Sequence, residues 1–237
     1  MSKRAVILCG GMGTRLRPYT VVLPKPLMPI GEYPILEVVV RQLNRAGFRH
    51  LTLAVNHQAE LIKAFFGDGG RWDVKIDYSF EKAPLSTVGP LTLIPDLPEH
   101  FLFLNGDVLT DLDFGRFLDD HVAENRAFTI AAARRRQQTD YGVLHVDQAS
   151  RLTAFEEKPV NDYLVSMGVY AASRALIGAI PPGTRYGFDN LMIDMLGRGQ
   201  MVTVHPHDGY WKDIGRPDDY MQAIDDFDSG IRAKLLP

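Results

Sequence analysis

The chain has 237 residues, 46% of them apolar, and a formal net charge of −3 at pH 7. A chain of this length can bury a substantial core within one α/β domain, so we expect a single domain over residues 1–237. The net negative charge argues against a general nucleic-acid or membrane-surface binder, because such proteins usually present a net basic field. Any anionic ligand must therefore be held by locally placed cations.

Cysteine use and hydropathy narrow the class of protein further. The single cysteine, Cys9, excludes an intramolecular disulfide framework and a cysteine-rich zinc site. The opening residues MSKRAVILCGG hold too short an apolar run for a signal peptide, and no apolar run approaches the ~20 residues that cross a bilayer. We expect a soluble cytoplasmic protein without nucleic-acid or membrane partners, and homo-oligomerisation is left open.

The first half of the chain alternates strand-like and helix-like segments. Apolar residues recur at helical spacing from Ile35 to Leu43, and Gly47 ends that segment. This alternation is typical of a mainly parallel sheet flanked by helices. The predicted strands cover residues 4–9, 50–56, 74–80, 101–107 and 127–133, and the predicted helices cover 33–48, 58–67 and 114–125.

The second half of the chain changes character. YGVLHVD (141–147) and RLTAFEE (151–157) predict a pair of strands, and the apolar segment LVSMGVYAAS follows them. A helix is expected around FDNLMIDMLGRG, a strand at MVTVHP, and a last helix from Pro217 to about Ser229. We find no internal repeat or linker, which agrees with one domain.

The stretch CGGMGTRLRP, which begins at Cys9, follows the first predicted strand. In open α/β sheets, ligands bind beyond the carboxyl ends of the strands. Glycines at such a position allow backbone N–H groups to approach phosphate oxygens closely. An ordinary tight turn would not explain why Arg15, Arg17 and Lys25 follow so soon, so the stretch predicts a phosphate-binding site.

Two common phosphate-binding motifs fit this stretch poorly. The dinucleotide fingerprint needs a third glycine where Leu16 stands, and an acidic residue where the second predicted strand ends in Asn56. The P-loop pattern G-x-x-x-x-G-K-[ST] occurs nowhere in the chain. A nicotinamide-dependent oxidoreductase would therefore rest on the glycines alone.

GGMGTRLRPYT followed by LPKPLMPI resembles the nucleotide-binding motif of the sugar-1-phosphate nucleotidyltransferases. These enzymes join a nucleoside triphosphate to a sugar phosphate with loss of pyrophosphate. The resemblance implies a Rossmann-like mixed α/β fold, with a nucleotide-binding half over about residues 1–110 and a sugar-phosphate-binding half over about 111–237. Further segments resemble the family in its own order: EKAPLSTVGPL (81–91), LNGD (104–107), YGVLHVD (141–147), FEEKP (155–159) and GYWKDIGRPDDY (209–220).

The short chain resembles most the compact guanylyltransferases that act on mannose-type or heptose-type sugar phosphates. STVGP stands where GTAGA or GTGGA is common in the family, and no glutamine is present there to bind a pyrimidine edge. The resemblance therefore favours GTP, with Thr87 and Gly89 as contacts to the base. A uridylyl-, thymidylyl- or cytidylyltransferase and a noncatalytic sugar-nucleotide-binding regulatory subunit stay as alternatives.

The reaction of this family needs positioned charge more than a protein nucleophile. By resemblance, Arg15 and Lys25 contact the β- and γ-phosphates, where negative charge builds on the leaving pyrophosphate. The resemblance also implies that the backbone of the glycine-rich turn contacts the nucleotide, through Gly10, Gly11, Gly13 and Thr14.

Asp107 in LNGD and Asp213 in YWKDIG are the expected metal ligands. A lone aspartate in a turn is more often a turn or cap residue, but two in the family's context favour a site for Mg²⁺. Asp111 and Asp113 lie close to Asp107 in the sequence. Asp113 fits an N-cap of the following helix, so neither is included in the site.

The expected acceptor site contains Gly142, Glu156 and Lys158. A compact ammonium between the two phosphates would reduce their repulsion, and Lys158 in FEEKP matches the family's motif for that role. Pro159 favours an extended conformation at Lys158. Without the resemblance, this segment would be interpreted as an exposed charged turn. The arginine run 134–136 is interpreted as a solvated edge of the sheet.

Overall fold

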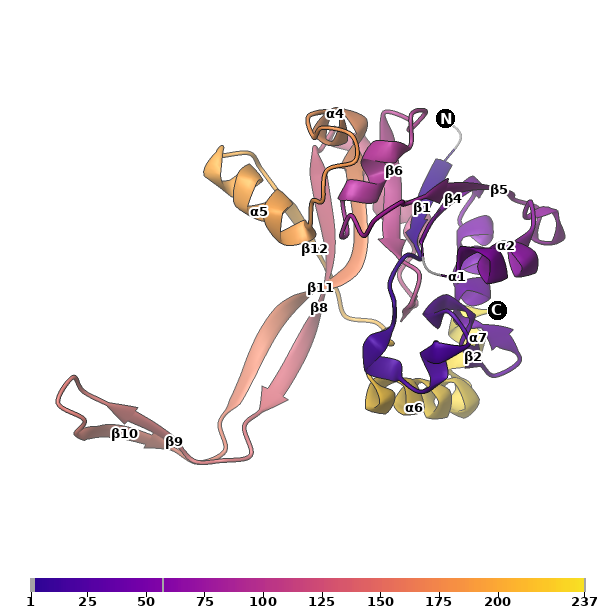
Figure 1. Cartoon of the computed structure of the whole chain (residues 1–237). Coiled ribbons are helices and arrows are strands. Elements are labelled where there is room, and N and C mark those ends of the chain that lie inside the picture. Colours follow the sequence, from indigo (N-terminus) through magenta and orange to yellow (C-terminus); the bar gives the residue numbers. More distant parts are fainter. Residues whose placement is uncertain (1–2, 57, 237) are drawn as a thin grey trace.

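The computed structural model describes residues 3–56 and 58–236 and has a mixed seven-stranded sheet at its centre (Figure 1). The strand order is β12-β8-β11-β6-β1-β4-β5, and only β11 pairs antiparallel to its neighbours. The predicted mixed, mainly parallel α/β fold is confirmed. The strands are β1 (Lys3–Leu8), β4 (Phe48–Val55), β5 (Lys75–Phe80), β6 (His100–Asn105), β8 (Phe128–Gln138), β11 (Val160–Ser173) and β12 (Thr203–His207).

Successive side chains of a strand point to opposite faces of the sheet, so apolar residues lie on both faces. Helices cover each face. Ile7 of β1 packs in the cluster that contains Leu36 and Ile62, whereas Val6 packs in the cluster that contains Ile177 and Leu191. The first face is covered by α1 (Ile35–Arg45), α2 (Ala59–Phe66) and α3 (Phe114–Ala123), and the second by α4 (Arg174–Gly178) and α5 (Phe188–Gly197).

A third apolar cluster holds the end of the chain against the glycine-rich turn. Leu16 packs with Ile214 and Tyr220, and Tyr220 belongs to α6 (Pro217–Asp226), which a π-helical turn connects to α7 (Arg232–Leu235). The helix predicted from Pro217 to about Ser229 is thus confirmed, but its α-helical part ends at Asp226 and the π-helical turn follows. Within the described part of the chain, none of the helices has the length and apolar character needed to cross a membrane.

Several short pairings were absent from the sequence prediction. β2 (Pro29–Ile30) pairs with β3 (Tyr33–Pro34), and β7 (Val108–Thr110) pairs antiparallel with β13 (Trp211–Asp213). Segments of two or three residues are too short to show periodicity, so local sequence cannot reveal them. The β7–β13 pair forms a separate two-stranded sheet and joins residues that are about a hundred positions apart.

The predicted strand ending at residue 133 instead continues to Gln138. Its continuation pairs with β11 from Arg134 opposite Leu164 to Gln138 opposite Val160, and the paired strands leave the body of the molecule. Beyond them, β9 (Val143–Val146) and β10 (Leu152–Glu156) form the predicted antiparallel hairpin. Residues 134–164 thus form an arm that projects away from the rest of the chain, called the head below (Figure 1).

Candidate functional site

A cavity of about 460 Å³ lies at the carboxyl edge of the sheet. It is lined by residues that directly follow four parallel strands: Cys9 after β1, Asn56 after β4, Glu81 after β5 and Gly106 after β6. Carboxyl ends of parallel strands meet at one edge, so this is where an α/β sheet binds ligands. The other lining residues are Leu8, Gly10, Gly11, Met12, Lys25, Pro26, Pro84, Ser86, Thr87, Pro90, Asn105 and Asp107.

The glycine-rich turn forms one wall of this cavity. Gly10 and Gly11 line it, and a Cβ placed on Gly11 would have no atom within 4 Å, so this side of the turn is open. Gly13 has φ +59, and Thr20 Oγ1 donates a hydrogen bond of 2.7 Å to its carbonyl. Thr14 begins a 3₁₀ turn and is exposed, outside the lining. Among the predicted backbone contacts, Gly10 and Gly11 are therefore best placed.

Four predicted charged residues meet at one end of the cavity: Lys25 and Asp107 line it, and Arg15 and Asp213 lie beside them, outside the lining. Lys25 Nζ forms an ion pair with Asp107 Oδ2 and lies 3.9 Å from Asp213 Oδ1. A Cβ placed on Gly215 would lie 3.0 Å from Arg15 Nη2 and 3.2 Å from Asp213 Oδ2, so the guanidinium lies beside the same carboxylate. The β7–β13 pairing sets this arrangement, because it brings Asp213 opposite the residue after Asp107.

The groups around Asp213 act in opposite directions on its pKa. Burial raises the pKa of Asp213, the nearby Asp107 charge raises this pKa further, and the Lys25 and Arg15 charges oppose both effects. Two carboxylates held close together repel one another, so the pair is suited to a site that a cation neutralises. Lys25 supplies that cation in this structure.

A hard divalent cation fits this pair of carboxylates. Asp107 Oδ1 is buried without a hydrogen-bond partner, which leaves a carboxylate oxygen available as a ligand. Oxygen ligands suit Mg²⁺, which keeps water and substrate phosphate among its ligands. In residues 3–56 and 58–236, no group of three or more His, Cys, Asp or Glu side chains is arranged to hold a metal by itself. The two aspartates would thus hold Mg²⁺ together with phosphate oxygens.

The loop expected beside the base forms another wall of the cavity. Ser86 and Thr87 line it, and Glu81 Oε2 accepts a hydrogen bond of 3.0 Å from Leu85 N. Gly89 is buried behind this wall: its N–H donates to Tyr186 O at 2.9 Å, and a Cβ there would lie 2.5 Å from a backbone oxygen. The structure thus brings Thr87 to the cavity and gives Gly89 a packing position.

The three predicted acceptor residues lie on the arm, outside the lining of the cavity. Gly142, Glu156 and Lys158 are exposed, and Glu156 Oε1 lies 2.8 Å from His145 Nε2 on the facing strand. The expected extended conformation at Lys158 is wrong, because its φ is +46 where the chain turns from β10 into β11. Within a single chain, the structure therefore separates these residues from Arg15, Lys25 and Asp107 (Figure 1).

Sequence reasoning missed three polar residues of the cavity: Asn56, Glu81 and Asn105. Each lies at or directly after the carboxyl end of a parallel strand. The predicted ends of these strands were therefore a signal that could have indicated all three residues. A Cβ on Gly10 would lie 2.7 Å from Glu81 Oε1, so this carboxyl group faces the glycine-rich turn. Burial raises the pKa of Glu81, and its hydrogen bond from Leu85 N opposes the effect.

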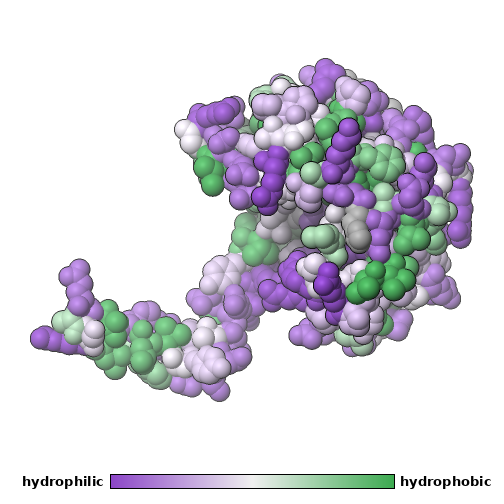
Figure 2. Space-filling model, in the orientation of Figure 1, coloured by the Kyte–Doolittle hydropathy of each residue, from purple (hydrophilic) through white to green (hydrophobic). Residues whose placement is uncertain are grey.

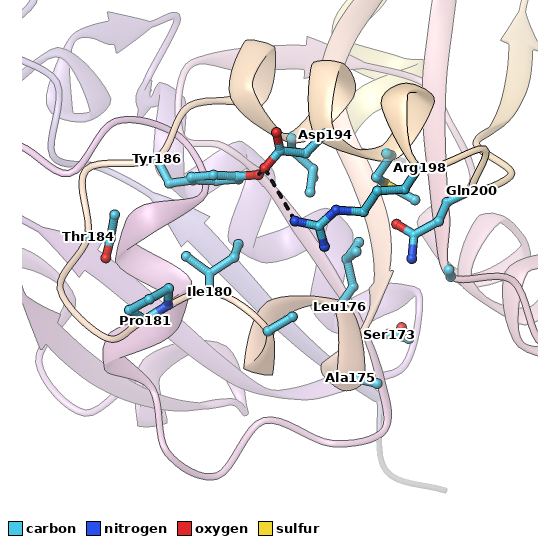
Figure 3. A pocket seen from close by; sticks show the side chains of 14 residues that line it. Ser173, Ala175, Leu176, Ile180, Pro181, Thr184, Tyr186, Asp194, Arg198 and Gln200 are labelled. Carbon is cyan, nitrogen blue, oxygen red and sulfur yellow. Dashed lines mark hydrogen bonds and ion pairs between the residues drawn. The ribbon is translucent and has the colours of Figure 1, made fainter.

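A second cavity, of about 380 Å³, lies beside the start of β8 and the end of β11 (Figure 3). Tyr186 OH donates a hydrogen bond of 2.5 Å to Asp194 Oδ2, and Arg198 lies 4.0 Å from the same carboxylate. Burial, together with the Asp194 carboxylate, raises the pKa of Tyr186 to about 12. None of the predicted site residues lines this cavity, which is at the opposite sheet edge.

Comparison with known proteins agrees with this geometry. Mannose-1-phosphate guanylyltransferase catalytic subunit beta of Danio rerio is 35% identical over 229 residues, with 93% of this chain and 63% of that protein covered. The UTP–glucose-1-phosphate uridylyltransferase of Synechocystis sp. is 34% identical over 242 residues, with 93% and 62% covered. The chain thus spans somewhat less than two thirds of these relatives.

A solved structure is similar over the whole domain. HddC from Yersinia pseudotuberculosis complexed with GMP-PN has a TM-score of 0.74 and 25% identity, with 95% of this chain and 99% of that chain covered. The family described as Nucleotidyl transferase matches residues 4–230, which include the glycine-rich turn and both aspartates of the site. The chain therefore belongs to the nucleotidyl transferase family.

Proposed function

We propose that this protein transfers a nucleoside monophosphate from a nucleoside triphosphate to a sugar 1-phosphate, giving a nucleoside diphosphate sugar and pyrophosphate. One observation carries the proposal: Arg15, Lys25, Asp107 and Asp213 meet at the end of a cavity walled by the glycine-rich turn. The proposed nucleotide-binding half is about residues 1–110 and the sugar-phosphate-binding half about 111–237. The need for a nucleoside triphosphate supports a cytoplasmic location.

The chemistry is a displacement at the α-phosphorus. A phosphate oxygen of the sugar 1-phosphate attacks, the bond from the α-phosphorus to the bridging oxygen breaks, and pyrophosphate leaves with that electron pair. Lys25 and Arg15 oppose the negative charge that builds on the leaving group. Mg²⁺ held by Asp107 and Asp213 would supply further charge neutralisation. The protein's main contribution is to hold the phosphates in line and to exclude water.

For the base and the sugar, we propose GTP and a mannose-type or heptose-type sugar 1-phosphate. The guanylyltransferase among the relatives and the GMP-PN complex of HddC support guanine. Ser86 and Thr87 in the cavity wall also support it, because this wall carries no glutamine to bind a pyrimidine edge. The uridylyltransferase relative keeps UTP as the alternative.

A grid of GTP, UTP, dTTP and CTP against several sugar 1-phosphates, with pyrophosphate release as the signal, tests the proposal. We expect turnover with GTP and Mg²⁺, and its loss in excess chelator. Triphosphate binding without turnover against every sugar phosphate would favour the noncatalytic alternative. A strong preference for UTP would contradict the assignment of the base.

The metal ligands are tested separately with Asp107→Asn and Asp213→Asn. Each should lower turnover strongly at saturating Mg²⁺, because an amide oxygen carries no charge to bind the cation. Asp113→Asn is the matched control: Asp113 accepts a hydrogen bond from Arg116 N as the N-cap of α3, and asparagine caps equally well. Near wild-type turnover in the first two variants would remove them from the metal site.

A further inference from the structure

We propose that the arm of one copy of this chain completes the acceptor site of a second copy in a symmetric dimer. The inference rests on the proposed function, because it concerns the origin of the sugar-phosphate-binding residues. In this dimer, a second copy of the chain covers the exposed face of the arm. Gly142, Glu156 and Lys158 would then act in trans, at the mouth of the second copy's cavity, which Lys25 and Asp107 line and beside which Arg15 and Asp213 lie.

The hairpin of the arm exposes many large apolar side chains. Tyr141 is 78% exposed, and Leu144, Val146, Leu152 and Phe155 are each more than half exposed. Figure 2 shows apolar side chains gathered on this part of the arm. A two-stranded hairpin without a packing partner is marginally stable in water, and contiguous exposed apolar surface marks an interaction site. The hairpin therefore needs a partner surface.

The stem of the arm adds to the same surface. Val160, Tyr163 and Leu164 are each about half exposed, at 49–50%.

The arm as a whole spans on the order of 30 Å at ~3.3 Å per strand residue, compared with a radius of gyration of ~18 Å for a compact chain of this length. An arm of this length reaches well beyond its own head and can cover a neighbouring molecule.

The backbone of the stem favours a partner molecule over folding back onto the same head. The ladder of β8 and β11 is continuous from Ala133 opposite Val165 to Gln138 opposite Val160, and Thr139 N donates to Pro159 O at 3.0 Å. Bending the stem back would break these paired hydrogen bonds and expose their backbone groups. Folding back of the hairpin alone would still leave the apolar side chains of the stem exposed.

The head carries an apolar patch beside the cavity that matches the arm. Met12 lines the cavity and is 61% exposed, and Tyr19, Val21, Val22 and Leu23 are exposed in the segment that follows. Docking the hairpin of a second copy on this patch would bring its polar residues to the mouth of the cavity. Lys158 of that copy could then supply the cation that a sugar phosphate needs when it approaches the triphosphate.

Charges on the two surfaces are also complementary. Arg134, Arg135 and Arg136 form the exposed root of the arm, and among the described residues Arg135 has no ion-pair partner. The head presents the acidic helix α6 next to Asp213, with Asp218 and Asp225 exposed on it. In a two-fold dimer each root meets the same surface of the partner, so one pairing of opposite charges is made twice.

Complementation between two defective chains tests the inference. Asp107→Asn removes the head function and Lys158→Ala removes the arm function, and the two chains are co-expressed with different affinity tags and purified through both. Every mixed dimer then holds one complete site, with Asp107 from one chain and Lys158 from the other, so about half of wild-type turnover is expected. Each variant alone should be nearly inactive. A mixed dimer as inactive as its parents would overturn the inference.

A second measurement does not depend on activity. Sedimentation velocity should show that the wild-type chain is a dimer and that Leu144→Asp with Phe155→Asp on the arm is a monomer with unchanged far-UV circular dichroism. The matched control is Ile193→Asp with Leu196→Asp on α5, two side chains that are each 68% exposed away from the arm. This control should stay dimeric.

The outcomes separate the two proposals. A wild-type chain that turns over the substrates as a monomer would overturn the dimeric site and leave the proposed function standing. A dimer that depends on the arm but turns over no sugar phosphate would overturn the proposed function and support the arm interface. Arm substitutions that leave the dimer intact would overturn the inference in either case.

Discussion

Among the residues of the proposed site, Arg15 is expected to act mainly in the transition state. It lies on an exposed turn beside Asp213, so its replacement should leave the fold intact and affect the reaction. We expect Arg15→Ala to lower turnover by ~10²-fold or more, the scale for losing one preorganised charge at the transition state. Steady-state kinetics at saturating triphosphate measure the effect.

Arg49→Ala is the control for this variant. Arg49 is also exposed, but it lies near the start of β4, away from the cavity, where Nη1 donates to Asn44 O. Its turnover should match that of the wild type. Normal turnover by Arg15→Ala at saturation, with only weakened triphosphate binding, would contradict a role in the transition state.

Two glycines of the same turn should respond differently to an added methyl group. Gly13 has φ +59, and its new Cβ would lie 2.9 Å from Thr20 Cγ2, so Gly13→Ala should lower the free energy of unfolding by about 1–3 kcal/mol. Gly11 has open space at that position and lines the cavity. Gly11→Ala should therefore keep wild-type stability and weaken nucleotide binding. Urea unfolding and nucleotide titration distinguish the two, and equal losses of stability would refute this assignment.

At the scale of elements, His121 connects α3 to the sheet. It is fully buried, Nδ1 lies 2.8 Å from Thr129 Oγ1 of β8, and Nε2 lies 3.1 Å from His100 Nδ1 of β6. Burial lowers the pKa of His121 from 6.5 to about 4, and the charges of His100 and Arg126 act in the same direction. The imidazole is thus held neutral in the folded protein.

This burial predicts loss of stability in mild acid. Between pH 6.5 and about 4, His121 binds a proton in the unfolded chain but not in the folded one, so its contribution is present above pH 6.5 and is lost as the pH falls. At 1.36 kcal/mol per pKa unit the loss approaches about 3 kcal/mol. Urea unfolding at a series of pH values measures it. His121→Gln should flatten this dependence and the exposed His145→Gln should keep it; the reverse result would contradict the prediction.

For the whole molecule, nucleotide binding should raise the melting temperature. A ligand that binds only the folded state stabilises it by about 2.7 kcal/mol at a hundred times its Kd. We expect a larger shift with GTP than with UTP at equal concentration and with Mg²⁺, because the proposed base contacts favour guanine. Differential scanning fluorimetry measures these shifts, with magnesium pyrophosphate as the control for phosphate contacts alone. Equal shifts for GTP and UTP would count against guanine preference.

Local sequence was sufficient to predict most of the fold. Strands such as β1 and β6 each contain an uninterrupted apolar run, AVIL and FLFL, and α1 has apolar residues at helical spacing, so burial and periodicity determine these elements. The glycine-rich turn and the basic residues after it predicted a phosphate site because their chemistry is concentrated in one short segment. Its position at the carboxyl edge of the sheet also followed from the sequence, through the alternation of strands and helices.

The family resemblance assigned Asp107 and Asp213 to one metal site, but the contacts that bring them together with Lys25 appear only in the tertiary structure. Asp213 joins Lys25 and Asp107 because β13 pairs with β7, and a pairing between two three-residue strands a hundred positions apart leaves no periodic signal. The same holds for the separation of Lys158 from the cavity. The motif around Lys158 indicates its chemistry, but its position depends on how far β8 and β11 stay paired beyond the sheet. Local patterns record burial and residue chemistry, whereas long-range pairing depends on contacts that are made only in the folded chain.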